Sequence, residues 1–275
     1  MGIKPNIETI YTIVTYKCNL KCAHCQLRLK SDNFNQDKFF DTIKQYKDIP
    51  MILFGGEPTL HIDRIKKICD NGNVVSISTN LINVDQQIID IVKQYNLSIA
   101  TSWNVVRFTP KQYQRWLSNL KLLSSNQIKT IVLITITEDL INYNINDLIM
   151  MFKQWTDTSA VSGILFEQLI DYSKQQQYYD CVDQWLIDVD RLWTSNIANN
   201  MIVDHVMNWS FNCSRKYTLH PDGRLTFGCP QYEKTEINSQ CYYCDFVNVC
   251  QPCRLQKCCT FPKKFYRYCN EKTSI

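Results

Sequence analysis

The sequence lacks a hydrophobic run that could cross a membrane, because none of its apolar stretches reaches about 18 residues. It also lacks a signal peptide, since the opening MGIKPNIETIYTIVTYKC has no charged segment followed by an apolar segment and a small-residue cleavage site. It lacks a strong charge of either sign, with 30 basic against 26 acidic residues. These absences argue against membrane and nucleic-acid partners, and we expect a cytoplasmic protein.

Nothing in the composition indicates disorder, tandem repeats or a low-complexity tail. Hydrophobic residues make up 45% of the chain and charged residues 20%, which supplies enough apolar material for a packed core. A length of 275 residues suits one large domain, or a barrel-sized domain with a small appendage.

Six apolar, β-branched runs alternate with amphipathic segments over the first 200 residues. The predicted strands are Thr9–Tyr16, Pro50–Phe54, Val74–Ser78, Leu97–Ser102, Thr130–Thr137 and Gly163–Leu169. The predicted helices are 36–47, 61–70, 85–95, 110–124, 146–154 and 174–195. This alternation predicts an α/β fold with a parallel sheet. Six units fall short of the eight of a closed barrel, which leaves a partial TIM-like (βα)6 barrel or a doubly wound sheet.

The 14 cysteines are unevenly placed. In a reducing compartment they indicate metal ligation or redox chemistry rather than disulfides. Three follow the first predicted strand, and nine lie between Cys213 and Cys269. This change in density, with a loss of periodicity, predicts a boundary between residues 1–205 and a small cysteine-rich domain at 206–275. Such a segment needs metal to fold.

The first cysteine group is Cys18-x3-Cys22-x2-Cys25. Structural zinc takes four protein ligands, whereas a set of three thiolates suits a 4Fe–4S cluster with one iron open to a small ligand. A zinc site completed by His24 or by a distant residue is the alternative.

Glycine and polar residues lie at or just after the ends of the next three predicted strands. Gly55-Gly56-Glu57-Pro58 follows the second strand, where glycines allow close approach of the backbone to a ligand and a carboxylate suits an ammonium group. Hydroxyl and amide side chains that suit sugar hydroxyls end the third and fourth strands; these are Ser78, Thr79, Asn80 and Ser102. Ordinary turns are the alternative for each.

Together these motifs resemble the radical S-adenosylmethionine (SAM) superfamily over roughly residues 9–170. The resemblance implies a 4Fe–4S cluster on Cys18, Cys22 and Cys25 whose open iron binds SAM. It implies reductive cleavage of SAM to a 5′-deoxyadenosyl radical that abstracts hydrogen from a substrate. The implied cofactor-binding residues are His24 near adenine, Gly55, Gly56 and Glu57 at the amino group, and Ser78, Thr79, Asn80 and Ser102 at the ribose. Many members have Thr-Asn-Gly where this chain has Thr79-Asn80-Leu81.

The last quarter resembles a SPASM domain, an auxiliary iron–sulfur extension of some radical SAM enzymes. It contains Cys213-x9-Gly223-x5-Cys229, then Cys241-x2-Cys244-x5-Cys250-x2-Cys253, one residue shorter than the family run, and Cys269. The resemblance implies an outer cluster on Cys241, Cys244, Cys250 and Cys269, and an inner cluster on Cys213, Cys229 and Cys253. The inner cluster's fourth ligand is Cys258 or Cys259, or one iron is open. A single-cluster twitch domain and a zinc module are the alternatives.

Residues that could transfer protons or bind substrate are less clearly marked. Asp222-Gly223 predicts a hairpin turn, and Asp222 and His220 are candidate bases within it. Arg107, after the fourth strand, is a candidate for contact with the SAM carboxylate or the substrate. A turn aspartate and a surface arginine are the plain alternatives.

The resemblance implies an oxidoreductase that modifies a peptide or protein side chain, served by an external electron donor such as flavodoxin or ferredoxin. The first strand is predicted to begin at Thr9, without an N-terminal peptide-recognition extension, which counts against a peptide substrate. A separate peptide-recognition protein could compensate. A radical SAM dehydrogenase or rearranging enzyme for a small molecule or nucleotide is the first alternative. A non-catalytic iron–sulfur electron carrier or interaction protein is the second, but it would not need the Gly-Gly-Glu-Pro motif.

Overall fold

The computed structural model describes residues 7–23, 25, 27–157, 161–168, 176–196 and 216–227. His24 and all nine C-terminal cysteines lie outside these residues, so their predicted roles stay predictions. Within the described ranges, no helix is both long enough and apolar enough to cross a bilayer.

Six strands each lead into a helix, as the sequence predicts. The strands are β1 (Thr9–Thr15), β2 (Met51–Gly55), β3 (Val74–Thr79), β4 (Ser98–Trp103), β5 (Thr130–Ile136) and β6 (Val161–Gln168). The main helices are α1 (Gln36–Gln45), α2 (Ile62–Asn71), α3 (Gln86–Gln94), α4 (Pro110–Ser125), α6 (Ile145–Asp157) and α7 (Gln176–Asn196). This order confirms the α/β fold. Three short helical turns escaped prediction because they are too short for periodicity: η1 (Leu27–Leu29), η2 (Pro58–Leu60) and α5 (Glu138–Ile141).

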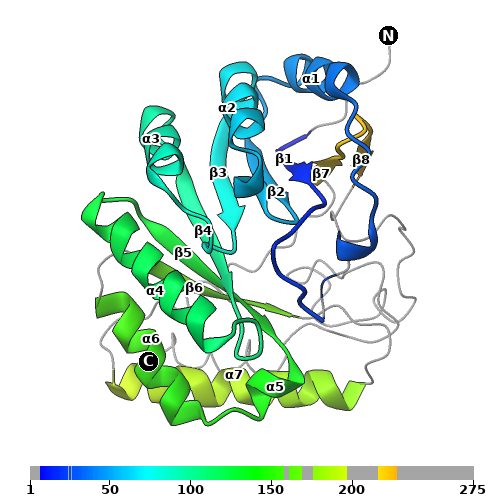
Figure 1. The fold of residues 1–275 in the computed structure, drawn as a ribbon. Coiled ribbons are helices and arrows are strands. Elements are labelled where there is room, and N and C mark those ends of the chain that lie inside the picture. The colour runs from blue at the N-terminus through cyan, green and yellow to red at the C-terminus, as the bar shows by residue number, and fades with distance from the viewer. Residues whose placement is uncertain are drawn as a thin grey trace. The chain divides into compact units, whose positions relative to one another are not determined.

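The chain divides into two compact units. The first comprises residues 1–102, 109–130 and 212–233, and the second comprises residues 103–108, 131–211 and 234–275. In the first unit the strand order is β4-β3-β2-β1-β7-β8, where β7 is Lys216–Leu219 and β8 is Leu225–Phe227. β7 and β8 are antiparallel, which confirms the predicted hairpin. β7 pairs in parallel with β1, so a late segment of the chain joins the first strand (Figure 1).

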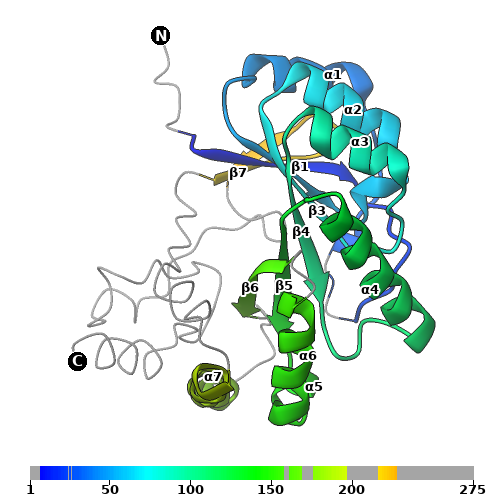
Figure 2. The ribbon, with the colours of Figure 1, turned by 90° about the vertical axis from the view of Figure 1, so that its left-hand side faces the viewer.

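The core of the first unit forms where one face of the parallel strands meets the helices. Leu53, Ile77 and Ile99 are register partners along β2, β3 and β4, and each is at most 1% exposed. Helices α1, α2 and α3 lie together on one side of these strands (Figure 2). Burial of each such side chain stabilises the fold by about 1.5–3 kcal/mol. Because β1 to β4 are parallel, their carboxyl ends share one edge of the sheet.

Helix starts in this unit follow local sequence signals. Thr109 caps α4 in a capping box with Gln112, and Pro110 occupies the first turn, as expected. Asp85 caps α3 by accepting from the Ile88 N–H at 3.2 Å. These caps fix where each helix leaves its loop, and thereby the loops that follow the strands.

The second unit has an aromatic core. β5 and β6 are hydrogen-bonded neighbours. The Phe152 ring of α6 lies 5.9 Å from Phe166 of β6 and 6.1 Å from Trp193 of α7, measured between centroids. All three side chains are at most 2% exposed, so α6 and α7 are packed onto β6 through rings.

Candidate functional site

The first three cysteines lie on the loop that leaves β1. Cys18, Cys22 and Cys25 are half-buried, and none of them forms a disulfide with a described residue. The Cys25 N–H donates to the Cys22 carbonyl at 3.2 Å, which closes a turn. Cys25 also packs against a small apolar cluster that includes Ile13 and Tyr16. The loop is therefore held against the end of β1.

The glycine pair after β2 seats this cysteine loop. The Gly56 N–H donates to the Thr15 carbonyl and the Glu57 N–H to the Lys17 carbonyl, each at 2.8 Å. A Cβ atom on Gly55 would lie 2.3 Å from the Thr15 oxygen, and one on Gly56 would lie 2.2 Å from the Lys17 oxygen. These two glycines therefore allow the cysteine loop to approach closely.

The Glu57 carboxylate is fully buried and joins the ends of β2 and β3. It caps the 3₁₀ turn η2, and the side chain is 0% exposed. Oε1 accepts from the Thr59 N–H at 3.1 Å, from the Thr59 hydroxyl at 2.7 Å and from the Thr79 hydroxyl at 2.7 Å. Oε2 accepts from the Asn80 N–H at 2.7 Å. A carboxylate has about four acceptor positions, so protein donors match its capacity.

Asn80 connects this network back to the cysteine loop. Its Nδ2 donates to Asn19 Oδ1 at 2.6 Å and lies 3.8 Å from Cys18 Sγ. Its Oδ1 accepts from the Ile82 N–H at 3.0 Å, and the side chain is 2% exposed. The amide is thus used at both ends.

Leu81 takes the place where a Thr-Asn-Gly motif would have glycine. Its φ is 61°, in the left-handed region that glycine adopts without strain. This conformation costs a residue with a Cβ about 1–2 kcal/mol. Complete burial of the leucine side chain offsets that cost. Asn119 Nδ2 also donates to the Leu81 carbonyl at 2.7 Å, so the turn is kept although glycine is absent.

The predicted ribose-binding residues separate onto different faces of the sheet. Ser78 pairs in register with Ala100, so Ser78 and Ser102 share a face, and both are half-buried. Thr79 points to the opposite face, where it donates to Glu57. Ser78 and Ser102 are therefore the members of this group whose side chains remain partly accessible.

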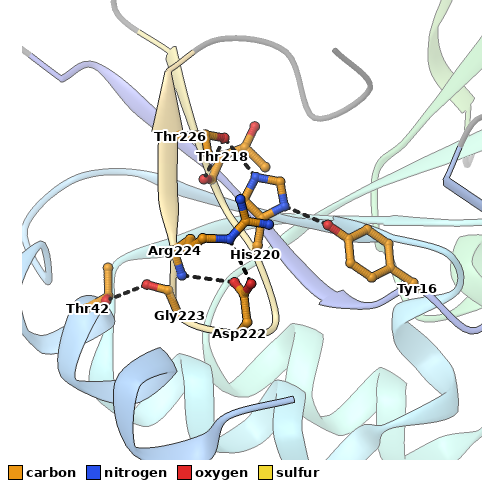
Figure 3. Close-up of polar contacts among 8 residues, drawn as sticks. All are labelled: Tyr16, Thr42, Thr218, His220, Asp222, Gly223, Arg224 and Thr226. Carbon is orange, nitrogen blue, oxygen red and sulfur yellow. Dashed lines mark hydrogen bonds and ion pairs between the residues drawn. The ribbon is translucent and has the colours of Figure 1, made fainter. Parts of the chain in front are cut away.

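His220 and Asp222 lie in the turn between β7 and β8, where Figure 3 shows the His220 ring between Tyr16 and Thr226. The Tyr16 hydroxyl is 2.6 Å from His220 Nδ1, and Thr226 Oγ1 is 2.7 Å from Nε2. The first of these contacts links the β7–β8 hairpin to the residue that follows β1. The His220 side chain itself is 1% exposed.

Asp222 stabilises the tip of the same hairpin. Burial would raise the pKa of Asp222, but hydrogen bonds from the Arg224 side chain and backbone outweigh it and lower the pKa. The Arg224 Nε lies 2.7 Å from Asp222 Oδ2. A carboxylate with a lowered pKa is a weak base, so the geometry favours the turn role over proton abstraction.

Arg107 belongs to the second unit, in the loop after β4. Its Nε is buried with no hydrogen-bond partner among the described residues. The guanidinium lies 5.7 Å from the centroid of the Phe108 ring.

One anchor of the cysteine loop escaped sequence reasoning. Asp32 accepts from the Thr15 hydroxyl at 2.9 Å and from the Tyr16 N–H at 2.8 Å. In the sequence Asp32 stands in a polar stretch typical of turns, and nothing there marks its partners.

The arrangement of the three cysteines bears on which kind of metal centre the loop could hold. Among the described residues, which do not include His24, no three His, Cys, Asp or Glu side chains converge closely enough to hold one ion. In a cubane cluster, each cysteine sulfur binds a separate iron. Three half-buried thiols on one loop, with N–H donors directed at the Cys18 sulfur, fit that donor set.

Comparison with known sequences points to one family. A family model described as "Radical SAM superfamily" matches residues 12–153. "Uncharacterized protein MJ0804" of Methanocaldococcus jannaschii is 27% identical over 184 residues, 62% of this chain and 59% of that protein. Fe-coproporphyrin III synthase of Methanosarcina barkeri is 30% identical over 112 residues, 37% of this chain and 28% of the relative. 7-Carboxy-7-deazaguanine synthase of Bacteroides thetaiotaomicron is 35% identical over 66 residues, 23% of this chain and 36% of the relative. The chain thus spans less than two thirds of the length of each of these relatives.

Solved structures share the fold at low sequence identity. Native anSMEcpe with bound AdoMet has a TM-score of 0.69 and 15% identity, over 96% of this chain and 95% of that chain. Streptococcus suis SuiB bound to precursor peptide SuiA has a TM-score of 0.65 and 13% identity, over 90% of this chain and 71% of that chain.

Proposed function

The chain belongs to the radical SAM superfamily, whose enzymes use a 4Fe–4S cluster and SAM, and from this premise we propose that it is an oxidoreductase modifying a peptide or protein side chain. The observation that carries the proposal is the three-cysteine loop seated on Gly55-Gly56 at the carboxyl edge of the sheet. When bound, the cluster and SAM together supply a radical able to remove hydrogen from an unactivated carbon.

This chain's own residues hold and orient those groups. Cys18, Cys22 and Cys25 would hold the cluster, and this set of three thiolates would leave one iron for SAM. The other cofactor-binding residues proposed from the sequence are His24, Gly55, Gly56, Glu57, Ser78, Thr79, Asn80 and Ser102. Of these, Ser78 and Ser102 carry partly accessible hydroxyls on a shared face, which suits contact with a sugar.

A peptide substrate is supported by one observation: SuiB, which shares this fold, has been solved with its precursor peptide bound. Near the hairpin, a cavity of about 300 Å³ has Tyr16, Lys30 and His220 in its wall, a volume at the lower end of the range for ligand pockets.

A small-molecule substrate is the second candidate, because two relatives carry names that specify small products, Fe-coproporphyrin III and 7-carboxy-7-deazaguanine. In either case the reaction needs an external electron donor such as flavodoxin or ferredoxin. For a peptide substrate, we also propose that a separate protein could recognise the peptide and present it to the enzyme.

We assign residues 206–275 to a SPASM-like auxiliary domain in a cytoplasmic enzyme. Its proposed ligands are Cys213, Cys229, Cys241, Cys244, Cys250, Cys253 and Cys269, with Cys258 or Cys259 completing the inner cluster. A single-cluster twitch domain would use fewer of these thiols.

The test measures 5′-deoxyadenosine released from SAM by the reconstituted, reduced protein. Peptide pools are compared with pools of nucleotides, sugars and porphyrins. We expect peptides alone to raise release above the substrate-free rate. Stimulation by a small-molecule pool instead would move the assignment to the second candidate, and no release under any condition would reject the enzyme proposal.

A further inference from the structure

Two N–H donors converge on the sulfur of Cys18. The Leu20 backbone N–H lies 3.4 Å from Sγ, and the Asn80 side-chain Nδ2 lies 3.8 Å from it. Because Asn80 Oδ1 accepts from the Ile82 N–H, the other end of the amide, the NH₂ group, faces the cysteine loop. The two hydrogens of that group serve Asn19 and Cys18.

The position of Asn80 is fixed by Glu57. The buried carboxylate holds the Asn80 N–H at 2.7 Å and the neighbouring Thr79 hydroxyl at 2.7 Å. The end of β3 therefore cannot shift without breaking bonds to a group that is 0% exposed. Glu57, Asn80 and the Cys18 sulfur form one connected path from the end of β2 to the cysteine loop.

We propose that Asn80 is a positioning residue that sets the reduction potential of the cluster bound through Cys18, and that Glu57 holds Asn80 in place for this role. The inference rests on the proposed function. Reduction adds one electron, taken from the external donor, and increases the negative charge on the cysteine sulfurs. N–H donors directed at a sulfur stabilise that charge and raise the potential. The effect is strengthened because Asn80 is buried away from water, at 2% exposure.

This role differs from a sugar contact. Both ends of the Asn80 amide are used by described residues of the chain itself, so the side chain presents no spare donor at the surface. Glu57 likewise acts through Thr79 and Asn80, since its carboxylate is enclosed by protein donors.

The test uses Asn80→Asp, which keeps the acceptor for Ile82 but replaces the NH₂ donor with an oxygen. The same change at Asn73, an exposed residue just before β3, is the matched control. Glu57→Gln is the second variant, because it leaves an amide NH₂ opposite the Asn80 N–H. Glu138→Gln, at an exposed position, is its control.

The measurement is a redox titration of the reconstituted holoenzyme followed by electron paramagnetic resonance. The signal of interest is the one that changes when SAM is added, which distinguishes this cluster from auxiliary clusters. We expect a more negative midpoint potential in Asn80→Asp, a smaller shift in the same direction in Glu57→Gln, and native values in both controls.

Native midpoints in both test variants would overturn the inference while leaving the proposed function intact. Loss of this cluster from both test variants, with the controls fully loaded, would also overturn it, because the network would then hold the cluster rather than tune it. A native protein without any SAM-responsive signal would reject the proposed function together with the inference.

Discussion

Replacement of Gly56 by alanine tests how the cysteine loop is seated. The added Cβ would lie 2.2 Å from the Lys17 oxygen and 2.6 Å from both the Lys17 carbonyl carbon and the Tyr16 oxygen. All three are backbone atoms, so no side-chain rotation relieves the clash. Ordinary contact at about 3.5 Å requires the loop to move by about 1.3 Å.

Such a movement breaks the two 2.8 Å hydrogen bonds that Gly56 and Glu57 donate to the loop. Overpacking costs about 1–3 kcal/mol, and each lost hydrogen bond costs about 0.5–1.5 kcal/mol. We therefore expect the free energy of unfolding to fall by roughly 2–6 kcal/mol.

The matched control is Gly163→Ala in β6, where an added Cβ would meet nothing within 4 Å. Urea unfolding of the metal-free proteins measures the stability change. Iron analysis after anaerobic reconstitution measures the consequence for the site, and Gly56→Ala should lose about one cubane of iron per chain. If Gly56→Ala matched Gly163→Ala in both assays, the reasoning about the loop would be wrong.

Further predictions concern Tyr16, Cys69 and Cys244. Tyr16→Phe removes the hydroxyl that lies 2.6 Å from Nδ1 of the buried His220. We expect the free energy of unfolding, measured by urea denaturation, to fall by about 1–3 kcal/mol. The control Tyr143→Phe, at an exposed residue, should leave it unchanged. Burial raises the pKa of the Cys69 thiol to about 12. Alkylation followed by mass spectrometry should therefore show that the exposed Cys181 is modified long before Cys69. Equal rates of alkylation at the two cysteines would contradict the packing of α2. Because the folded state keeps the Cys69 proton longer than the unfolded state, the free energy of unfolding should also fall as the pH rises from about 9 toward 12. Cys244→Ala should lower the iron content and make the tail more sensitive to protease while SAM binding persists, and an unchanged iron content would remove Cys244 from the ligand set.

The strands and helices were predictable because their signals are local. Each predicted strand is a run of β-branched and apolar residues, and the ends found in the structure differ by at most two residues. The start of α4 was predictable because Thr109-Pro110 combines a capping residue with a proline at the first helical position. Such features depend on neighbours a few residues away.

The contacts that shape the site were not predictable, because they join distant segments. Tyr16 and His220 are 204 positions apart, and the pairing of β7 with β1 brings them together. Asn80 meets the cysteine loop only because β3 lies beside β2, which lies beside β1. The Gly-Gly-Glu-Pro motif could be identified from the sequence, but the backbone carbonyls of Thr15 and Lys17 that lie against its glycines could not be predicted.

The most direct test of the central claim is the release of 5′-deoxyadenosine from SAM by the reduced, reconstituted protein, compared with a variant in which Cys18, Cys22 and Cys25 are all replaced by alanine. We predict release by the native chain and none by the variant. Equal release by both, or none by a fully iron-loaded native chain, would contradict the account.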